Sequence, residues 1–502
     1  MPPARSRHGV VAAGHPAVVD AAAAVLIAGG NAYDAVVAAG FASTVAEPGF
    51  TSLAGGGFAL ARTGAGEELL FDFFVDTPGR GRTEERRPPR FESVDVRFPA
   101  ATQGFHCGLG SVAVPGVLAG FLHLHRRLGQ LPLADVVAPA VALAADGVTV
   151  APQQAAVIAL LAPILRRTPE VEAIFSVEGR MACAGDRLRN ADLARFLDRI
   201  GRDPEAGFYR GSVADQLVAA MAAGDGLVTA EDLGAYGVVE REPLAVAYRG
   251  RRVLTNPPPS FGGRLIALAL RLLEDAGPLP RHGSADHAAA LLGVMVEVDR
   301  RRAEGAAATT PSAVRGTTHV SVADVEGNVA AMTTSNGECS GDLIDGTGVL
   351  LNNMLGEDDL HPGGFHAAPP GLRVASMMSP TVVVDTDGQV ELVLGSGGSK
   401  RIRTAVLQVL THVVDGGVPL AGAVEAPRLH WENGRVEVEP GLPPALIERL
   451  EELGPVNVWP ERNLFFGGVH AVVPGGDGVG DPRRDGAWRQ IPPPDVMVDT
   501  SG

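Results

Sequence analysis

The pattern of apolar residues changes abruptly near residue 316, and this change constrains the fold more than any other feature of the sequence. Before it, stretches rich in Ala, Val and Leu have helical spacing and are separated by turns that contain Gly and Pro. After it, apolar and polar residues alternate over residues 319–324, a Gly-containing turn follows, and residues 329–333 form a second strand-like stretch. This pattern predicts a hairpin. We therefore expect a mainly helical part with some strands, residues 1–316, and a β-rich part, residues 317–502.

Each part contains further recognisable elements. Residues 16–40 predict two closely packed small-residue helices divided at a Gly-Gly pair, and residues 112–148 predict another helical pair. Residues 79–97 are rich in Arg, Glu and Pro and predict an exposed loop. Residues 381–394 predict a second hairpin, which leads through a glycine-rich loop into a helix over residues 403–414.

The composition indicates a globular protein and argues against several classes. Of the 502 residues, 46% are hydrophobic and 20% charged, enough apolar surface to offset chain entropy. The net charge is −16 without a long basic patch, which argues against a nucleic-acid partner. We find no run of about 18 apolar residues and no signal-peptide pattern. The three cysteines lack metal-ligand spacing and fit a reducing compartment. We therefore expect a cytoplasmic protein with no bound metal and no membrane contact.

The junction between the two parts has residues suited to self-cleavage. Residues 306–316 are small and polar, which predicts a flexible linker, and Gly316 precedes Thr317. The Thr317 hydroxyl could attack the Gly316 carbonyl, and hydrolysis would then free an α-amine beside that hydroxyl. Such an amine has a reference pKa of about 7.7–8.0 and can act as the base for its own hydroxyl. Taken alone, the pattern is explained more simply by two ordinary strand threonines.

A glycine-rich loop at residues 395–399 joins the second predicted hairpin to its helix. Backbone amides of Gly397 and Gly398 could point at one oxygen and stabilise a tetrahedral oxyanion, assisted by the helix N-terminus. A phosphate loop is an alternative, but the spacing matches neither of the usual nucleotide motifs. A plain structural turn is the third interpretation.

An acidic run follows a pair of asparagines. Residues 357–359 are all acidic and come shortly after Asn352 and Asn353. They could hold an ammonium group or a metal, or form a solvated acidic turn, and the pattern does not separate these interpretations.

Together these features occur in the order and spacing of the γ-glutamyltranspeptidases, and the sequence resembles this family over nearly its whole length. Each motif is ordinary, whereas the ordered set is highly specific. The matching segments are residues 29–35, 55–58, 114–116, 256–263, 317–324, 350–353, 379–381 and 395–399.

The resemblance implies an α+β fold, a four-layer αββα sandwich of the N-terminal-nucleophile (Ntn) hydrolase type. Two chains cut from one precursor would form it, a large chain of residues 1–316 and a small chain of residues 317–502. The site residues that it implies are the nucleophile Thr317, its hydrogen-bond partner Ser335, the oxyanion amides of Gly397 and Gly398, and Ser376 near the substrate.

The sequence departs from the family where a γ-glutamyl substrate would bind. The family's carboxylate-binding arginine is replaced by Phe74, and a buried Phe cannot pair with a carboxylate, a loss that typically costs several kcal/mol. The other substrate-binding positions are Met377 in place of a second serine, Met354 in place of a glutamine, Glu357 in place of an aspartate, and Asn336 in a loosely matching stretch.

We therefore expect a self-processing hydrolase or acyltransferase that acts on a small acyl or amide substrate other than glutathione, without a cofactor. The short segment of residues 360–372 favours hydrolysis over transfer. Lys400 and Arg401 could supply a substitute cation or form a solvated helix end.

Three alternatives about activity and assembly remain open. One is a true γ-glutamyltransferase or glutathione hydrolase, and another is an inactive family member that acts as a binding protein. The cleaved chains would form a heterodimer, and a dimer of heterodimers is a further option.

Overall fold

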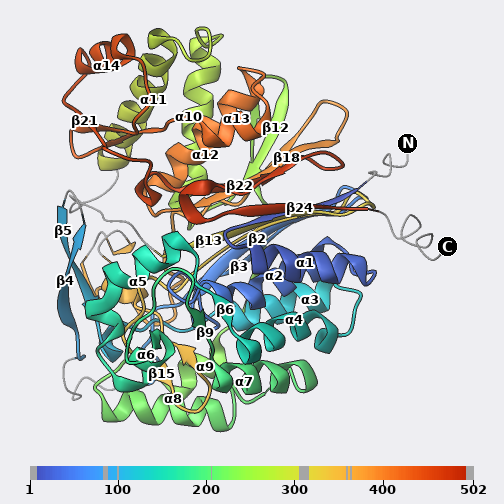
Figure 1. Cartoon of the computed structure of the whole chain (residues 1–502), viewed down its shortest axis with the longest axis vertical. Helices are drawn as coiled ribbons and strands as arrows, with labels where there is room; N and C mark the ends of the chain where they lie inside the picture. Colours follow the sequence, from blue (N-terminus) through green and yellow to red (C-terminus); the bar gives the residue numbers. More distant parts are fainter. Residues whose placement is uncertain are drawn as a thin grey trace.

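Two antiparallel sheets packed face to face form the centre of the molecule, with helices on both outer faces (Figure 1). The computed structural model describes residues 8–82, 89–98, 101–204, 206–304, 316–357, 360–361 and 364–492. The four layers are helices, seven-stranded sheet, six-stranded sheet and helices, so the expected αββα sandwich is confirmed.

The seven-stranded sheet has the order β10-β3-β2-β14-β13-β1-β24. It lies between a helix layer and the second sheet, which is why β13 and β14 are buried along their whole length and carry, apart from His319, apolar residues and small polar ones. Its strands are β1 Gly9–Ala13, β2 Gly56–Arg62, β3 Glu68–Phe73, β10 Val239–Arg241, β13 Thr318–Ala323, β14 Val329–Ser335 and β24 Ala487–Ile491.

The six-stranded sheet has the order β11-β12-β17-β18-β22-β23 and packs against the first sheet through β18 and β22. Both predicted hairpins are confirmed, β13–β14 in the first sheet and β17–β18 in the second. The strands of this sheet are β11 Leu244–Tyr248, β12 Arg251–Thr255, β17 Thr381–Val384, β18 Val390–Gly397, β22 Gly468–Val472 and β23 Gly478–Val479.

Helix α2 is the central helix of one outer layer and packs on β13 and β14. An Asn31–Asp34 capping box starts it, and it is buried on nearly all sides, which explains its small residues. The helices of this layer are α1 Pro16–Ile27, α2 Ala32–Ala46, α3 Val117–Leu128 and α4 Leu133–Asp146. Those of the opposite layer are α10 Phe261–Ala276, α11 Ala285–Glu304, α12 Arg401–Val414, α13 Leu420–Glu425 and α14 Pro444–Glu451.

The remaining elements form the periphery. Its helices are α5 Pro152–Leu165, α6 Pro169–Ile174, α7 Ala191–Arg202, α8 Ser212–Ala223 and α9 Ala230–Ala235. Its strands are β4 Glu92–Phe98, β5 Ala101–Cys107, β6 Val148–Thr149, β7 Ser176–Val177, β8 Arg180–Met181, β9 Arg187–Leu188, β15 Leu343–Ile344, β16 Val349–Leu350, β19 Leu429–Glu432, β20 Arg435–Val438 and β21 Val456–Val458.

The expected exposed loop over residues 79–97 is wrong in its second half. Residues from Glu92 onward form β4, which pairs with β5, because Val94 and Val96 alternate with polar residues and Val96 is fully buried. Residues 83–88 lie outside the described residues, as does the predicted linker up to residue 315. Among the helices that the structure describes, none is long and apolar enough to cross a membrane.

Candidate active site

Thr317 lies where the ends of the two sheets meet. It immediately precedes β13 and is 4% exposed, and the neighbouring β14 ends at Ser335. From the second sheet, β18 ends at Gly397, where an added Cβ atom would lie only 2.2 Å from the carbonyl oxygen of Thr317. The fold therefore brings together residues from three separate segments that the sequence predicts as parts of one site.

The peptide bond between Gly316 and Thr317 is held from both sides. The Ser335 hydroxyl donates a hydrogen bond to the Gly316 carbonyl oxygen and accepts one from the Gly337 amide at 3.0 Å. A Cβ atom on Gly316 would lie 2.4 Å from the Gly337 carbonyl oxygen and 2.6 Å from that of Gly49. Residue 316 must therefore be glycine for this peptide to fit beside Ser335.

The glycine-rich loop lies directly against this peptide. Gly398 has φ of +119° and Ser399 has φ of 54°, so the chain turns sharply before α12 begins at Arg401. Positive potential from the α12 N-terminus is directed towards the loop. This position beside Thr317 fits an oxyanion site better than a phosphate loop.

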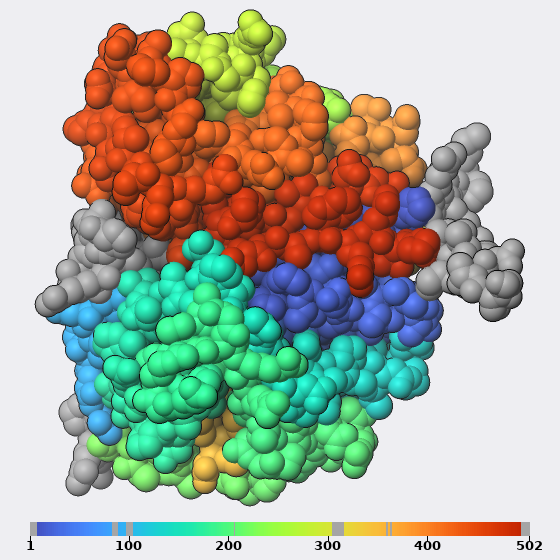
Figure 2. All heavy atoms as spheres, viewed as in Figure 1, coloured from blue at the N-terminus to red at the C-terminus, as the bar shows by residue number. Residues whose placement is uncertain are grey.

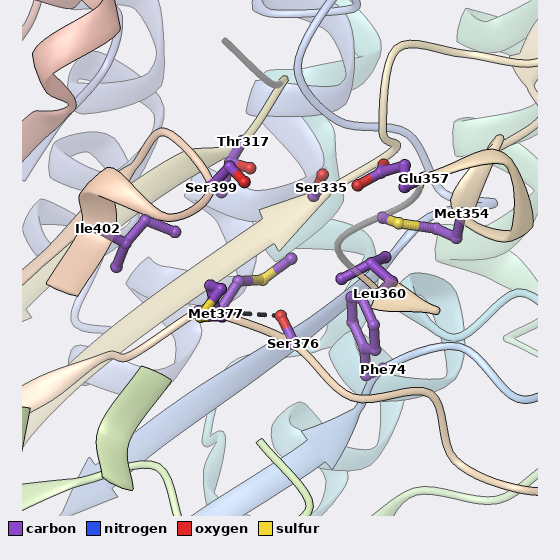
Figure 3. A pocket seen from close by; sticks show the side chains of 11 residues that line it. Phe74, Thr317, Ser335, Met354, Glu357, Leu360, Ser376, Met377, Ser399 and Ile402 are labelled. Atoms are coloured by element: carbon purple, nitrogen blue, oxygen red, sulfur yellow. Dashed lines mark hydrogen bonds between the residues drawn. The ribbon is translucent and has the colours of Figure 1, made fainter. Parts of the chain in front are cut away.

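A pocket that is open to solvent lies beside Thr317. Figure 3 shows the hydroxyls of Thr317 and Ser335 on one side of it, and the Phe74 ring and Leu360 on another. The lining residues predicted from the sequence are Phe74, Thr317, Ser335, Met354, Glu357, Ser376 and Met377. Ser399 belongs to the predicted glycine loop, and the lining residues that the sequence did not indicate are Leu360, Met378 and Ile402.

Asn336 is the predicted substrate-binding residue that does not line this pocket. Its side chain is buried, its amide nitrogen donates to the Leu351 carbonyl oxygen at 3.3 Å, and its backbone amide donates to that of Phe50. These contacts tie the end of β14 to neighbouring loops instead of facing the pocket.

The pocket wall opposite Thr317 is apolar and firmly packed. Phe74 is 1% exposed and stacks on Phe58 with ring centroids 5.5 Å apart. Its carbonyl oxygen accepts hydrogen bonds from the Tyr236 hydroxyl at 2.7 Å and from Arg373. The ring is thus held where the resemblance would place a cation.

Comparison with known proteins agrees with this geometry. The sequence matches the gamma-glutamyltranspeptidase family model over residues 19–306 and 296–491. It is 34% identical over 517 residues to the Acylase ACY 1 proenzyme of Pseudomonas sp. (strain SE83), covering 95% of this chain and 92% of that protein. It is 31% identical over 545 residues to the glutathione hydrolase proenzyme of Escherichia coli (strain K12), covering 96% of this chain and 91% of that protein.

The chain belongs to the γ-glutamyltranspeptidase family. The crystal structure of cephalosporin acylase from Bacillus halodurans has the same fold, with a TM-score of 0.81 at 27% identity over 96% of both chains. Membership of this family establishes the chain as a hydrolase or acyltransferase.

Next to the glycine loop, the basic residues are buried. The Lys400 ammonium lies 3.3 Å from a Glu432 carboxylate oxygen, and the Arg401 guanidinium donates to the Phe465 carbonyl oxygen at 3.1 Å. Neither residue lines the pocket, and both are at most 3% exposed. The expectation of a solvated helix end is therefore wrong, and so is that of a substitute cation in the pocket wall.

The acidic run differs from a solvated turn as well. Glu357 is 4% exposed and lines the pocket, whereas Asp358 and Asp359 lie outside the described residues. The preceding Asn352 is fully buried and bonds both to Ala113 and to the Ala54 carbonyl oxygen, which fixes the loop that presents Met354 and Glu357.

Two buried charges next to Thr317 were not indicated by the sequence. Glu47 follows α2 and accepts hydrogen bonds from the Thr318 hydroxyl at 3.0 Å, and burial raises its pKa to about 7. Arg484 donates to the Thr317 carbonyl oxygen at 2.9 Å, and burial lowers its pKa to about 10. No motif identifies either residue, because each reaches the site only through the tertiary fold.

Proposed function

We propose that this protein is a self-processing N-terminal-threonine hydrolase that removes an apolar acyl group from an amide. The observation that carries the proposal is the pocket in which Thr317 and Ser335 face an apolar wall of Phe74, Met354 and Met377. The nucleophile, the cleavage position and the substrate class are parts of this proposal.

The first step is cleavage of the chain. The Thr317 Oγ attacks the Gly316 carbonyl carbon while the Ser335 hydroxyl stabilises the negative charge on the carbonyl oxygen. The C–N bond breaks as an ester forms between Gly316 and the Thr317 oxygen, and the proton of the hydroxyl passes to the departing Thr317 nitrogen. Water then hydrolyses this ester and leaves a carboxylate on Gly316 and a free α-amine on Thr317.

The same hydroxyl then acts on substrate. Its proton passes to the α-amine as Oγ attacks the acyl carbonyl carbon, and backbone amides of Gly397 and Gly398 stabilise the oxyanion. The proton moves on to the leaving amine as the amide C–N bond breaks. Water releases the acyl group from the oxygen of Thr317 as a carboxylic acid.

The pocket wall favours an apolar acyl group over a γ-glutamyl group. Burying an apolar side group against Phe74, Met354 and Met377 is worth about 1.5–3 kcal/mol. Described lining residues include the acid Glu357 and no Lys or Arg that would pair with a substrate carboxylate. Relatives named as acylases support an acylase, and those named as glutathione hydrolases support the second candidate.

The two cleavage products, residues 1–316 and 317–502, would remain one folded unit. In the seven-stranded sheet, β14 and β13 of the small chain lie between β2 and β1 of the large chain, and β24 of the small chain follows β1. Figure 2 shows the red C-terminal surface meeting the blue N-terminal surface across the middle of the molecule. A heterodimer follows from this interleaving, while higher assembly and the cytoplasmic location stay predictions.

Intact-mass measurement of purified protein tests the cleavage. We expect two chains divided between residues 316 and 317 in the wild type and one uncut chain in Thr317→Ala. Thr318→Ser, which retains the hydroxyl that bonds to Glu47, is the matched control and is expected to be cut. A folded wild type that stays uncut would overturn the proposal and support a binding role.

Hydrolysis of two 4-nitroanilides tests the substrate class. We expect phenylacetyl-4-nitroanilide to be hydrolysed at least about 10-fold faster, in kcat/KM, than γ-glutamyl-4-nitroanilide. A reversed preference would support the glutathione hydrolase candidate.

A further inference from the structure

A buried arginine beside Thr317 has donor groups that the described residues do not satisfy. Arg484 ends the short helix η5, Pro482–Arg484, and is 3% exposed. Its Nη1 donates to the Thr317 carbonyl oxygen at 2.9 Å, whereas its Nε and Nη2 have no hydrogen-bond partner in the described part of the chain. A buried charge with incomplete hydrogen bonding is costly, so its presence here requires a physical reason.

The Arg484 guanidinium lies beside both Thr317 and the glycine loop. It lies over the Phe50 ring, 5.0 Å from the centroid. A Cβ atom on Gly397 would lie 3.1 Å from its Nη1, and one on Gly398 would lie 3.7 Å from its Nη2. One side chain therefore contacts the backbone of the proposed nucleophile and packs beside the proposed oxyanion loop.

Glu47 supplies the opposite charge from the end of α2. Its carboxylate accepts hydrogen bonds from the Thr318 hydroxyl, one residue from Thr317. The Arg484 guanidinium opposes the rise that burial causes in the pKa of Glu47, and Glu47 opposes the fall in the pKa of Arg484. Above about pH 7, where Glu47 is ionised, a cation and an anion thus act on consecutive residues of the chain.

Other charged groups near this pair have partners of their own. Asp481 lies 2.6 Å from Arg428 and also pairs with Arg483, and Arg401 is held by Glu432 and Phe465. The remaining groups that face the pair are Asp485 beside Glu47 and His470 on β22. Asp485 accepts hydrogen bonds from the Gln153 and Gln154 backbone amides. Arg484 and Glu47 are therefore the charges in direct contact with residues 317 and 318.

We propose that Arg484 is a positioning residue that fixes the Thr317 backbone, and that its charge, opposed by Glu47, keeps the freed Thr317 α-amine in its neutral, proton-accepting form. This inference rests on the proposed cleavage at residue 317. A neutral amine is required because only that form can take the proton from the Thr317 hydroxyl. A cation within about 4–6 Å disfavours protonation, and an anion at that distance favours it.

The amine can be titrated directly, without a substrate. Lys400 is the sole lysine of the sequence, so the small chain has only two amines, the Thr317 α-amine and the Lys400 ε-amine. Acetylation of cut protein by acetic anhydride over a pH series, read by peptide mass spectrometry, separates the two. The pH midpoint of Thr317 acetylation reports the pKa of its amine.

We expect opposite shifts in two variants. Arg484→Met raises the midpoint by about one pH unit, because a cation is lost, and Glu47→Gln lowers it, because an anion is lost while the hydrogen bond to Thr318 is retained. Arg489→Met is the matched control, an exposed arginine on β24 that pairs with Asp20, and its midpoint is expected to equal that of the wild type.

Midpoints that do not move, or that move in the same direction in both variants, would overturn the inference. Should Arg484→Met remain uncut, Glu47→Gln decides alone, since a lowered midpoint supports the inference and an unmoved or raised one contradicts it. A wild type that is not cut would instead remove the proposed function itself, so the two failures are distinguishable.

Discussion

The two sides of the candidate active site are built differently. On the nucleophile side, polar contacts hold the backbone, with Ser335 on the Gly316 carbonyl oxygen, Arg484 on that of Thr317 and Glu47 on the Thr318 hydroxyl. On the acyl side, the contacts to the pocket come mainly from packed side chains such as Phe74 and Met377.

This difference indicates which properties each side controls. Backbone geometry held by hydrogen bonds tolerates little change, because a small displacement of the nucleophile from the reacting carbonyl carbon greatly lowers the reaction rate. An apolar wall can be rebuilt by substitution without disturbing that geometry. A family with one reaction and several acyl substrates is what such a division would permit. Changes on the nucleophile side should therefore affect cleavage, and changes on the acyl side should affect only substrate choice.

The largest expected effect follows from filling the space at Gly316. Gly316→Val places a Cβ atom within 2.6 Å of two carbonyl oxygens, so the peptide can no longer lie beside Ser335, and we expect no cleavage. Intact mass after prolonged incubation measures this. Gly237→Ala is the control, since a Cβ atom there meets nothing within 4 Å. A variant cut at the wild-type rate would show that the precursor does not hold this peptide as described.

Removal of the Ser335 hydroxyl should have the next largest effect. Ser335→Ala deletes the donor to the Gly316 carbonyl oxygen, and loss of one oxyanion donor slows a reaction by about 10²–10³-fold. The rate of chain cleavage, followed by gel electrophoresis, should fall accordingly, while Ser335→Thr restores most of it. Cleavage that is unchanged in Ser335→Ala would mean that the contact is only structural.

A smaller and different effect is expected on the acyl side. Phe74→Leu should leave chain cleavage unchanged and lower kcat/KM for phenylacetyl-4-nitroanilide by about 10-fold, the usual effect of lost apolar contact in a pocket. Phe41→Leu is the control for stability, because Phe41 on α2 is also fully buried but packs in a hydrophobic cluster separate from that of Phe74. Impaired cleavage in Phe74→Leu alone would break the division between the two sides.

The two sides also differ in how far the sequence could predict them. Thr317 and the glycine loop belong to ordered motifs at strand ends, and the resemblance to the family matches Ser335 and Phe74 to individual positions. Leu360, Met378 and Ile402 carry no signal, since an apolar residue in a pocket resembles one in a core. These three residues reach the pocket only when the chain is folded.

The charges beside Thr317 could not be predicted for the same reason. Arg484 is 167 residues from Thr317, and Glu47 is 271 residues from Thr318. The sequence offered a substitute cation or a solvated helix end for Lys400 and Arg401, and neither interpretation included a buried ion pair. Glu432, on a strand distant in sequence, instead provides a buried partner for Lys400.

The last expected effect concerns stability instead of rate, and it tests whether the buried carboxyl group of Glu47 on the nucleophile side lowers the free energy of unfolding at neutral pH. Burial raises the pKa of Glu47 from its usual 4.5 to about 7. The folded protein therefore holds a proton that the unfolded chain loses above pH of about 4.5. As the pH rises through this window, the unfolded state binds fewer protons, so the free energy of unfolding falls, and above about pH 7 it levels off.

Glu47→Gln has no carboxyl group to titrate at this position, so its free energy of unfolding should not fall in this way as the pH rises. We take the difference in free energy of unfolding between variant and wild type at pH of about 4.5 as the reference. Between that pH and pH 8, we expect this difference to shift in favour of the variant by up to about 3 kcal/mol. Melting temperatures of both proteins at the two pH values measure the gain, with Glu425→Gln on the exposed end of α13 as control. A relative gain that is absent, or equal in the control, would mean that Glu47 is ionised in the folded protein at no cost. The buried carboxyl group on the nucleophile side would then not lower the stability of the fold.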